Sequence, residues 1–394
     1  MNAVKNIALA IHLAVPHLEG IVHGVVAYAQ THGNWRFALN LEAYTFPLEN
    51  LAGWDGDGAI AMIETEDQLR LAKSWGFPVV NVADTLKDTG LPLVTNDNQK
   101  MGQLAAAHLM ERGLRHFAFY GLEDMWYSQE RSVGFRDAIV AAGHQCLLFE
   151  SPSSFRAMWT TQWQSDELDE WLLQLPRPCG LLATHDFRAW AVIESCRRLG
   201  IRVPFDIAVV GVDDSPIICN SCNPPLTSVR PKSHQLGYRA GEYLNHIMSH
   251  SSAKPRTLLI EPDRISERGS TDTIAVEDPT LQKALNFIHS NIQSQINVAD
   301  VARTMGISRR WLFSLFHEQF GKTPHDYLAD IRIRLAKELL TQLPLLSLKD
   351  IAGRCGFAST DRLNKVFTRV SGCSPRKFRD SQLAAHGNGV FKSR

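Results

Sequence analysis

The sequence contains no run of 18 uncharged apolar residues, the length that identifies a candidate transmembrane helix. Residues 7–15 form an apolar stretch near the beginning of the chain that resembles a signal-peptide core. His12 interrupts this stretch and no small-residue cleavage site follows it, so we interpret it as a buried strand. We therefore expect a cytoplasmic protein with no membrane segment.

Cysteine is scarce, and the motifs of common enzyme classes are missing. The seven cysteines are odd in number and scattered, which is typical of a reducing cytosol. Cys219 and Cys222 form a C-x-x-C pair, but the second ligand pair that zinc needs is absent nearby. There is no P-loop, no G-x-G-x-x-G after a strand, no G-x-S-x-G elbow and no complete H-E-x-x-H motif. We expect no enzyme activity, no cofactor and no metal site.

The chain has no net charge, yet its two ends differ in sign. The 41 Lys and Arg residues balance the 41 Asp and Glu residues. From Leu281 onward there are 18 basic and 8 acidic residues, which leaves 23 basic and 33 acidic residues in the first 280. An acidic body followed by a basic region suggests that the C-terminal part binds a polyanion, most simply nucleic acid. A solvated basic surface is the alternative.

Short apolar runs alternate with helical patterns over residues 5–270. Strands are expected at residues 7–13, 58–63, 78–82, 116–121, 180–183 and 207–212, with helices between them, for example at 16–32, 100–112 and 131–142. Such alternation predicts βαβ units and a mainly parallel sheet. Because one sheet rarely absorbs about 270 residues, we expect two α/β lobes with a cleft between them.

The basic region contains an internal repeat at an offset of 50 residues, or 51 after a one-residue insertion. The matched pairs are Asp300 with Asp350, Gly306 with Gly356, Leu312 with Leu363, Phe316 with Phe367, Gly321 with Gly372, and Pro324 with Pro375. Each copy predicts a short helix, a turn at its Gly and a second helix, which is helix-turn-helix spacing. The turn Gly supplies the positive φ of the corner, and Ser308 and Ser359 are placed to cap the second helices.

This repeat, over residues 281–380, resembles the AraC-type DNA-binding domain of bacterial transcription regulators. The resemblance implies two helix-turn-helix motifs, at about 298–319 and 348–370, joined by a long helix at about 325–343. The two recognition helices then enter successive major grooves of DNA. Mapped onto this chain, the outward-facing candidates are Arg309, Arg310, Phe313, Ser314 and His317 in the first, and Thr360, Asp361, Arg362, Asn364 and Lys365 in the second.

These side chains suit DNA. Arginine binds guanine O6 and N7 in a bidentate manner, asparagine suits adenine, and Phe313 suits a thymine methyl group. Ser, Thr and Lys365 also suit phosphate. Asp361 is unexpected against DNA unless it accepts from cytosine or orients Arg362. A solvated helix face is the alternative interpretation of all ten residues.

The acidic body resembles the two-lobed effector domain shared by LacI-type repressors and periplasmic sugar-binding proteins. The matching segments are collinear over almost the whole body and lie at residues 94–102, 107–113, 116–121, 131–135, 183–186, 199–214, 224–229 and 267–271. The resemblance implies a type I periplasmic-binding-protein-like α/β fold. That family's own N-terminal DNA-binding headpiece has no counterpart, because residue 5 is already expected in the first strand.

A LacI-type effector domain followed by an AraC-type domain is similar to the arrangement of the bacterial xylose operon regulators. We expect an effector domain over residues 1–270, a linker over 271–280, the AraC-type domain over 281–380 and a tail over 381–394. The resemblance implies a sugar-responsive activator whose partners are double-stranded DNA, a sugar (D-xylose first), a second copy in a homodimer, and RNA polymerase.

The resemblance also implies the effector contacts. Arg131 and Asp213 correspond to the cleft arginine and cleft aspartate, and Trp126 is the expected aromatic platform for the sugar, with Tyr127 as the alternative. Asp97 and Asp186 end strands that line such clefts, although each could equally cap a helix. His12 is expected to contact ligand or to be a structural histidine, and His185 stands where many relatives carry Asn.

Two alternatives remain at this point. The effector could be another aldose, a nucleoside or a sugar acid, for which Arg188, Lys232 and Arg239 would supply charge. A solute-binding protein for transport or chemotaxis is the alternative from another class, and the basic helix-turn-helix repeat opposes it.

Overall fold

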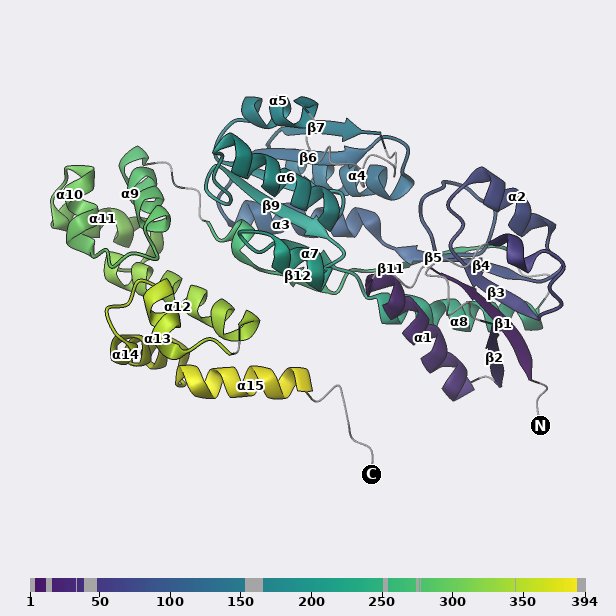
Figure 1. The fold of residues 1–394 in the computed structure, drawn as a ribbon. Helices are drawn as coiled ribbons and strands as arrows, with labels where there is room; N and C mark the ends of the chain where they lie inside the picture. Colours follow the sequence, from purple (N-terminus) through teal and green to yellow (C-terminus); the bar gives the residue numbers. More distant parts are fainter. Residues whose placement is uncertain are drawn as a thin grey trace. The chain divides into compact units, whose positions relative to one another are not determined.

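The structure is a computed structural model, which describes residues 4–11, 16–32, 34–38, 48–152, 166–250, 254–273, 276, 278–343 and 345–387. The chain divides into two compact units, unit 1 (Met1–Ile274) and unit 2 (Ala275–Arg394). Each unit is described by itself (Figure 1).

Unit 1 contains two six-stranded sheets. Sheet A has the order β11-β5-β4-β3-β1-β2, is parallel, and consists of β1 (Lys5–Ala10), β2 (Trp35–Ala38), β3 (Gly58–Ala61), β4 (Val79–Asn81), β5 (Leu93–Asn96) and β11 (Thr257–Ile260). Sheet B has the order β12-β10-β9-β8-β6-β7 and consists of β6 (His116–Leu122), β7 (Cys146–Ser151), β8 (Cys179–Ala183), β9 (Ile207–Val212), β10 (Thr227–Arg230) and β12 (Arg264–Ser266). Only β12 is antiparallel to its neighbour among these strands.

Helices cover both faces of each sheet. Their bounds are α1 (Pro16–His32), α2 (Glu66–Ser74), α3 (Asn98–Glu111), α4 (Trp126–Ala141), α5 (Asp166–Gln174), α6 (Asp186–Leu199), α7 (Pro216–Ser221) and α8 (Ser233–Ser249), with 3-10 turns at Leu48–Leu51 and Gly269–Thr271. Alternate residues of β1 face opposite cores, Ile7 and Leu9 toward α1 and α8, and Ala8 and Ala10 toward α2. Lobe A is sheet A with α1, α2 and α8; lobe B is sheet B with α3 to α7 (Figure 1).

The chain crosses between the lobes three times, before α3, before α8 and between β11 and β12. The predicted two-lobed α/β architecture is therefore confirmed. The first strand begins at Lys5, two residues before the apolar run, because Lys5 and Asn6 pair with Trp35 and Arg36 of β2 and backbone hydrogen bonding extends the strand through polar residues. The predicted C-terminal end of that strand, beyond residue 11, lies outside the described residues.

Glycines allow two helix pairs to pack with their backbones in contact. A Cβ on Gly24 of α1 would lie 2.0 Å from the His234 carbonyl oxygen, and a Cβ on Gly237 of α8 would lie 1.8 Å from the Ile21 carbonyl oxygen. In lobe B, a Cβ on Gly134 of α4 would lie 2.0 Å from the Gln99 carbonyl oxygen. These distances are far below van der Waals contact, so only glycine permits either crossing.

His108 of α3 predicts how stability depends on pH. Its Nε2 lies 2.9 Å from Thr271 Oγ1, and burial, followed by the nearby Arg112, lowers the pKa of His108 to about 4, although Glu267 opposes the shift. Between about pH 6.5 and pH 4, His108 is protonated in the unfolded chain but neutral in the folded chain. The free energy of unfolding therefore falls as the pH drops through this interval. Between pH 7 and 5 this group should contribute a loss of about 2 kcal/mol.

The measurement is urea denaturation of the wild type and His108→Gln at pH 7 and pH 5. The glutamine keeps a polar group toward Thr271 and does not titrate, so the variant should lose less stability than the wild type over this interval. Equal losses in the two proteins would show that His108 is not the group responsible.

Unit 2 is helical throughout its described part. Its elements are α9 (Pro279–Ser290), α10 (Val298–Met305), α11 (Arg309–Phe320), α12 (Pro324–Gln342), α13 (Leu348–Arg354), α14 (Thr360–Ser371) and α15 (Pro375–Gly387). Both turn glycines have the predicted positive φ, 68° at Gly306 and 67° at Gly356. Ser308 and Ser359 accept hydrogen bonds from the backbone at Trp311 and Arg362, so both predicted N-caps are confirmed. Thus α10–α11 and α13–α14 form two helix-turn-helix motifs.

The long helix α12 joins the two motifs by packing into both of their cores. Leu328, in its first half, belongs to the core formed with α9, α10 and α11. Ile333, Ala336 and Leu340, further along, belong to the core formed with α13 and α14. Between the cores, Arg332 donates to the Ser294 and Ile296 carbonyl oxygens and lies over the Phe357 ring.

Candidate functional site

In unit 1, Arg131 of α4 is the centre of a polar cluster between elements of both lobes. The Arg131 side chain is only 4% exposed. Its Nε donates to Asn98 Oδ1 at 2.9 Å, its Nη1 donates to the Thr184 carbonyl oxygen, and its guanidinium lies over the Tyr127 ring at 5.0 Å. The two hydrogen bonds fix the plane of the guanidinium, which is the group that makes paired hydrogen bonds to vicinal oxygens.

Asp84, in the loop after β4, joins this cluster from lobe A. It accepts hydrogen bonds from Thr95 at 2.8 Å and Asn98 at 2.6 Å. Its backbone carbonyl, and that of Thr85, accept from the backbone N–H groups of Tyr127 and Trp126 at 3.0 Å. The two lobes are therefore hydrogen-bonded to each other at the first turn of α4.

Further polar groups lie close to Arg131. Burial raises the pKa of Tyr127 to about 12, with Arg131 opposing the shift and Asp213 and Asp84 adding to it. Burial lowers the pKa of His185 to about 3, with Arg188, Arg131 and His17 acting in the same direction. His185 is thus neutral at pH 7, and its Nδ1 accepts from the backbone N–H of Arg188. Three polar atoms here are shielded from water and unpaired among the described residues: His17 Nδ1, Thr184 Oγ1 and Arg188 Nε.

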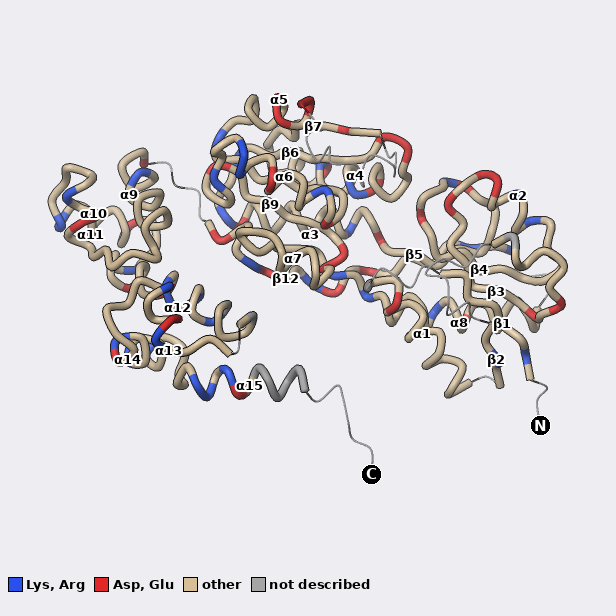
Figure 2. The backbone as a smooth tube through the Cα atoms, in the orientation of Figure 1, with Lys and Arg blue, Asp and Glu red and all other residues tan. Residues whose placement is uncertain are grey.

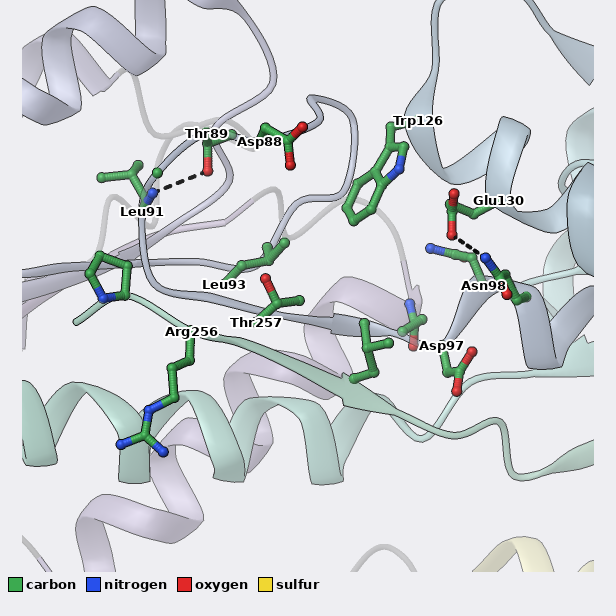
Figure 3. A pocket seen from close by; sticks show the side chains of 15 residues that line it. Asp88, Thr89, Leu91, Leu93, Asp97, Asn98, Trp126, Glu130, Arg256 and Thr257 are labelled. Carbon is green, nitrogen blue, oxygen red and sulfur yellow. Dashed lines mark hydrogen bonds between the residues drawn. The ribbon is translucent and has the colours of Figure 1, made fainter. Parts of the chain in front are cut away.

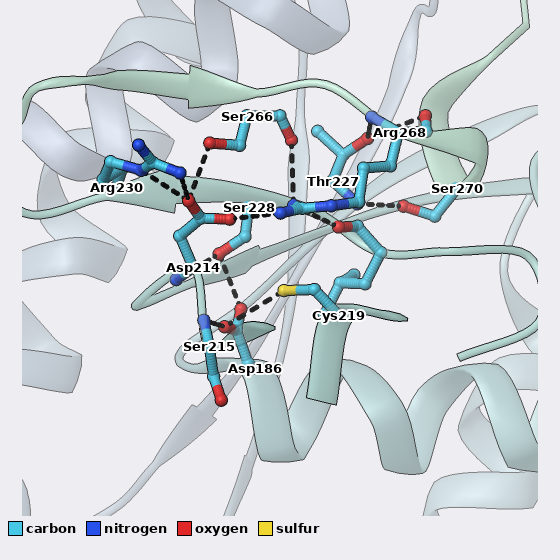
Figure 4. Close-up of polar contacts among 11 residues, drawn as sticks. Asp186, Asp214, Ser215, Cys219, Thr227, Ser228, Arg230, Ser266, Arg268 and Ser270 are labelled. Carbon is cyan, nitrogen blue, oxygen red and sulfur yellow. Dashed lines mark hydrogen bonds and ion pairs between the residues drawn. The ribbon is translucent and has the colours of Figure 1, made fainter. Parts of the chain in front are cut away.

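The Asp213 carboxylate is presented by a strained turn after β9. Asp213 and Asp214 have φ of 109° and 50°, which non-glycine residues seldom adopt. Asp214 is buried and holds the turn in place by accepting from Arg230, Arg268 and Ser266 (Figure 4). Among the described residues no hydrogen bond or ion pair engages the Asp213 carboxylate itself, which leaves it available to a ligand.

Asp186 supports the same turn from the other side and does not face a ligand. It is 1% exposed and accepts from the Ser215 backbone N–H at 2.7 Å, Ser228 Oγ at 2.6 Å and Cys219 Sγ at 3.4 Å (Figure 4). Burial raises its pKa well above the usual range, and the neighbouring Asp213 adds to this. Asp186 was expected to line the cleft or to cap a helix; the cap of α6 is His185, and Asp186 instead holds the turn that presents Asp213.

The remaining predicted effector contacts are dispersed. Asp97 caps α3 by accepting from the Lys100 backbone N–H. Trp126 lines a separate groove with Asp97, and Tyr127, the alternative platform, is the aromatic residue against Arg131. His12 lies outside the described residues. Sequence reasoning missed Asp84, although its position directly after a buried strand was a usable signal.

In unit 2, the ten predicted DNA contacts lie on the outer faces of α11 and α14. Exposed side chains are Arg309, Arg310, Ser314 and His317 of α11, and Asp361, Arg362 and Lys365 of α14. Phe313, Thr360 and Asn364 are half-buried. Figure 2 marks the basic residues, Lys and Arg, and the acidic residues, Asp and Glu, along the backbone of these helices. Asp361 stands in the first turn of α14, where the partial positive charge of the helix N-terminus stabilises a carboxylate.

A hollow of about 320 Å³ lies along α11. It is lined by Arg310, Phe313, Ser314, His317, Glu318 and Thr323. The ring of Phe313 lies among polar side chains, of which Arg310, Ser314 and Thr323 can donate hydrogen bonds and Glu318 can accept them. Trp311, a further aromatic residue of this helix that was not among the predicted contacts, is 49% exposed.

Three family models match the chain. "Periplasmic binding proteins and sugar binding domain of LacI family" matches residues 14–161, and "Periplasmic binding protein-like domain" matches residues 106–271. A "Helix-turn-helix domain" model matches residues 301–381. Together they cover the two lobes of unit 1 and the paired motifs of unit 2.

Full-length relatives have the same combination. The xylose operon regulatory protein of Escherichia coli K12 is 28% identical over 368 residues, with 91% of this chain and 93% of the relative covered. That of Haemophilus influenzae Rd is 27% identical over 382 residues, covering 95% and 98%. A solved structure titled "structure of xylose-binding transcription activator xylR" superposes with a TM-score of 0.76 at 26% identity, covering 96% of this chain and 99% of the other. The chain is thus similar to the xylose operon regulators over nearly its whole length.

This similarity and the three matching domain models confirm the expected regulator architecture. This regulator has a sugar-binding type of domain in unit 1 and a DNA-binding domain in unit 2. A solved cellobiose complex of the regulator CelR superposes with a TM-score of 0.54 at 25% identity, covering 67% of this chain and 84% of the other. Among the described helices of the regulator, none is long and apolar enough to cross a membrane.

Proposed function

We propose that this regulator is a D-xylose-dependent transcription activator. The observation that carries the proposal is the presence, in one chain, of the Arg131–Asp213 cluster and of two capped helix-turn-helix motifs. A sugar bound between the lobes stabilises the arrangement in which Arg131, Asp84 and Asp213 all contact it, and so shifts the population toward it. By linkage, the sugar then raises affinity for DNA and DNA raises affinity for the sugar.

We further propose that the regulator acts as a cytoplasmic homodimer without enzymatic activity, and that RNA polymerase is its partner at the promoter. Each protomer carries two recognition helices, so a dimer requires paired half-sites. Closure of the two lobes on the effector in each protomer aligns the two unit 2 domains on these half-sites. Because the half-sites are themselves proposed, DNA affinity is measured on duplexes that the full-length protein selects from a random library.

Removing one base-contacting arginine should weaken specific DNA binding. In Arg310→Ala or Arg362→Ala we expect affinity for the selected duplex to fall about tenfold or more, because a bidentate arginine–guanine contact contributes about 1–3 kcal/mol of discrimination. Binding of D-xylose should be unchanged. Fluorescence anisotropy of labelled duplex, with and without D-xylose, measures both the affinity and its dependence on the sugar.

Arg197→Ala is the matched control, since Arg197 is an exposed arginine of unit 1 paired with Glu194. It removes the same charge and should leave affinity as in the wild type. If D-xylose does not change the wild-type affinity, the proposed coupling is wrong. If Arg310→Ala and Arg197→Ala behave alike, the proposed recognition face is wrong.

A sugar acid is the second candidate effector. Arg188 favours it, because its guanidinium lies near His185, contacts Tyr120 Oη at 2.9 Å and keeps a shielded, unpaired Nε. A carboxylate ligand would pair with this second arginine. Repeating the anisotropy titration with D-xylonate in place of D-xylose distinguishes the two effectors by which one raises DNA affinity.

A further inference from the structure

Unit 1 has a second groove, apart from the Arg131 cluster. Its volume is about 580 Å³, which is within the range of small-molecule sites. Its wall consists of the loop 88–91, residues 255–259 at β11, and the first turns of α3 and α4 (Figure 3). Neither Arg131 nor Asp213 nor His185 is among the residues that line it.

The floor of this groove, from here the β11 groove, is apolar. In the parallel pair β5–β11, Thr257 is paired with Leu93 and Leu259 with Thr95. Leu259 is 53% exposed although it lies in a strand. Trp126 comes from lobe B, and its indole ring points into the groove above Leu93 and Thr257 (Figure 3). An aromatic face above an aliphatic floor provides two walls for a flat ligand ring.

Polar side chains surround this apolar core. Asp88, Asp97 and Glu130 contribute carboxylates, whereas the Arg256 side chain points away from the groove (Figure 3), so the lining carries negative charge and disfavours an anionic ligand. Asn96 Oδ1 and Trp126 Nε1 are shielded from water and have no hydrogen-bond partner among the described residues. Shielded polar atoms are paired in most native structures, so two unpaired ones at a single groove need an explanation.

A polyhydroxylated neutral ring fits these features. Its C–H face packs on the indole, and its hydroxyls donate to the carboxylate and amide oxygens of the lining. We propose that the β11 groove is a second saccharide site, which binds a neutral mono- or disaccharide separately from the Arg131 cluster.

The position of the β11 groove links it to the lobes. Trp126 lines the groove, whereas the next residue, Tyr127, lies against Arg131. Both are hydrogen-bonded through their backbones to Thr85 and Asp84, in the loop that also carries Asp88. Because residues of both lobes line the groove, a ligand there binds one lobe arrangement better than another and shifts the population. The groove thus reports on the same conformational equilibrium as the cluster.

Saturation-transfer NMR on the full chain tests this proposal, with D-xylose and xylobiose as separate probes. The first variant, Arg131→Ala, removes the cluster as a binding site. The second adds Leu259→Arg, which fills the groove from an exposed position. The matched control adds Leu173→Arg instead, since Leu173 is an exposed leucine of α5 (55%) outside the groove. Thermal melts check that all three variants are folded.

We expect transfer to at least one probe in Arg131→Ala, the same transfer with Leu173→Arg added, and about a tenfold weaker affinity with Leu259→Arg added, a change of about 1.4 kcal/mol. No transfer to either probe in Arg131→Ala, or equal transfer in the Leu259→Arg and Leu173→Arg proteins, would overturn the proposal. The second site does not rest on the effector assignment. If D-xylose does not change the DNA affinity of the wild-type protein, the proposed function is refuted. The second site in the β11 groove is tested separately, by the saturation-transfer comparison among the Arg131→Ala variants.

Discussion

Arg131→Ala is expected to abolish the response to D-xylose. Charge-assisted hydrogen bonds contribute about 1.5–3 kcal/mol each, so loss of a paired contact should weaken sugar affinity about 100-fold or more. The change also leaves Asn98 Oδ1 and the Thr184 carbonyl without their donor, so lobe B loses the hydrogen bonds that join α4 to α3 and to the end of β8. A thermal-shift titration measures this, since D-xylose at 100 times its dissociation constant should stabilise the wild type by about 2.7 kcal/mol.

The control for this variant lies on the same helix. Arg136→Ala removes an exposed arginine next to Asp137, and its sugar response should match that of the wild type. DNA affinity without sugar should be unchanged in both variants, because unit 2 carries the recognition helices. Arg131→Lys keeps a charge but not the planar fork, and should fall between alanine and the wild type. A folded Arg131→Ala protein with a normal D-xylose shift would refute the placement of the site.

Gly237→Ala should destabilise unit 1 by about 3 kcal/mol or more, because one methyl group must displace a helix. The added Cβ would lie 1.8 Å from the Ile21 carbonyl oxygen, which is backbone and has no rotamer to change. The helices α1 and α8 must then separate along a crossing that buries Leu236, Ala240 and Leu244. For a unit of this size, the midpoint of thermal unfolding should fall by roughly 6 °C or more.

Gly76→Ala is the control for this substitution. No heavy atom lies within 4 Å of a Cβ at Gly76, so its unfolding midpoint should change little. Urea denaturation of both variants, followed by circular dichroism, gives the free energies of unfolding. Equal stabilities would mean that the α1–α8 crossing relaxes without loss of packing.

The helix-turn-helix motifs could be predicted in detail because their signals are local. Gly306 and Gly356 are required where the chain turns with positive φ, and Ser308 and Ser359 are required two and three residues later to cap the next helix. Each of these choices depends on backbone geometry within a few residues. The edge strands β2, β7, β11 and β12 were not predicted, because exposed positions break their apolar pattern, and the interior strands β5 and β10 were not predicted, because each has only four residues.

The effector residues were harder to predict because their roles depend on contacts between distant segments. Trp126 and Tyr127 are adjacent in sequence, yet one lines the β11 groove and the other lies against Arg131. The orientation of α4 about its own axis determines which of the two side chains faces Asp84, because successive residues of a helix point about 100° apart. Asp186 and Asp213 both follow strands, and only the donors from Ser215, Ser228 and Cys219 distinguish the buried carboxylate from the free one.

Because α12 packs into both helix-turn-helix cores, its length sets the distance between the two motifs. Its 19 residues span about 28 Å, at about 1.5 Å per residue. Successive major grooves on one side of B-DNA recur about every 34–36 Å. One residue inserted into α12 would rotate the second recognition helix by about 100° about the α12 axis, so the two recognition helices could no longer enter successive major grooves together. The length of this helix therefore fixes the separation and the relative rotation of the two recognition helices, and we expect each half-site to be a two-part sequence whose parts stand at one fixed separation.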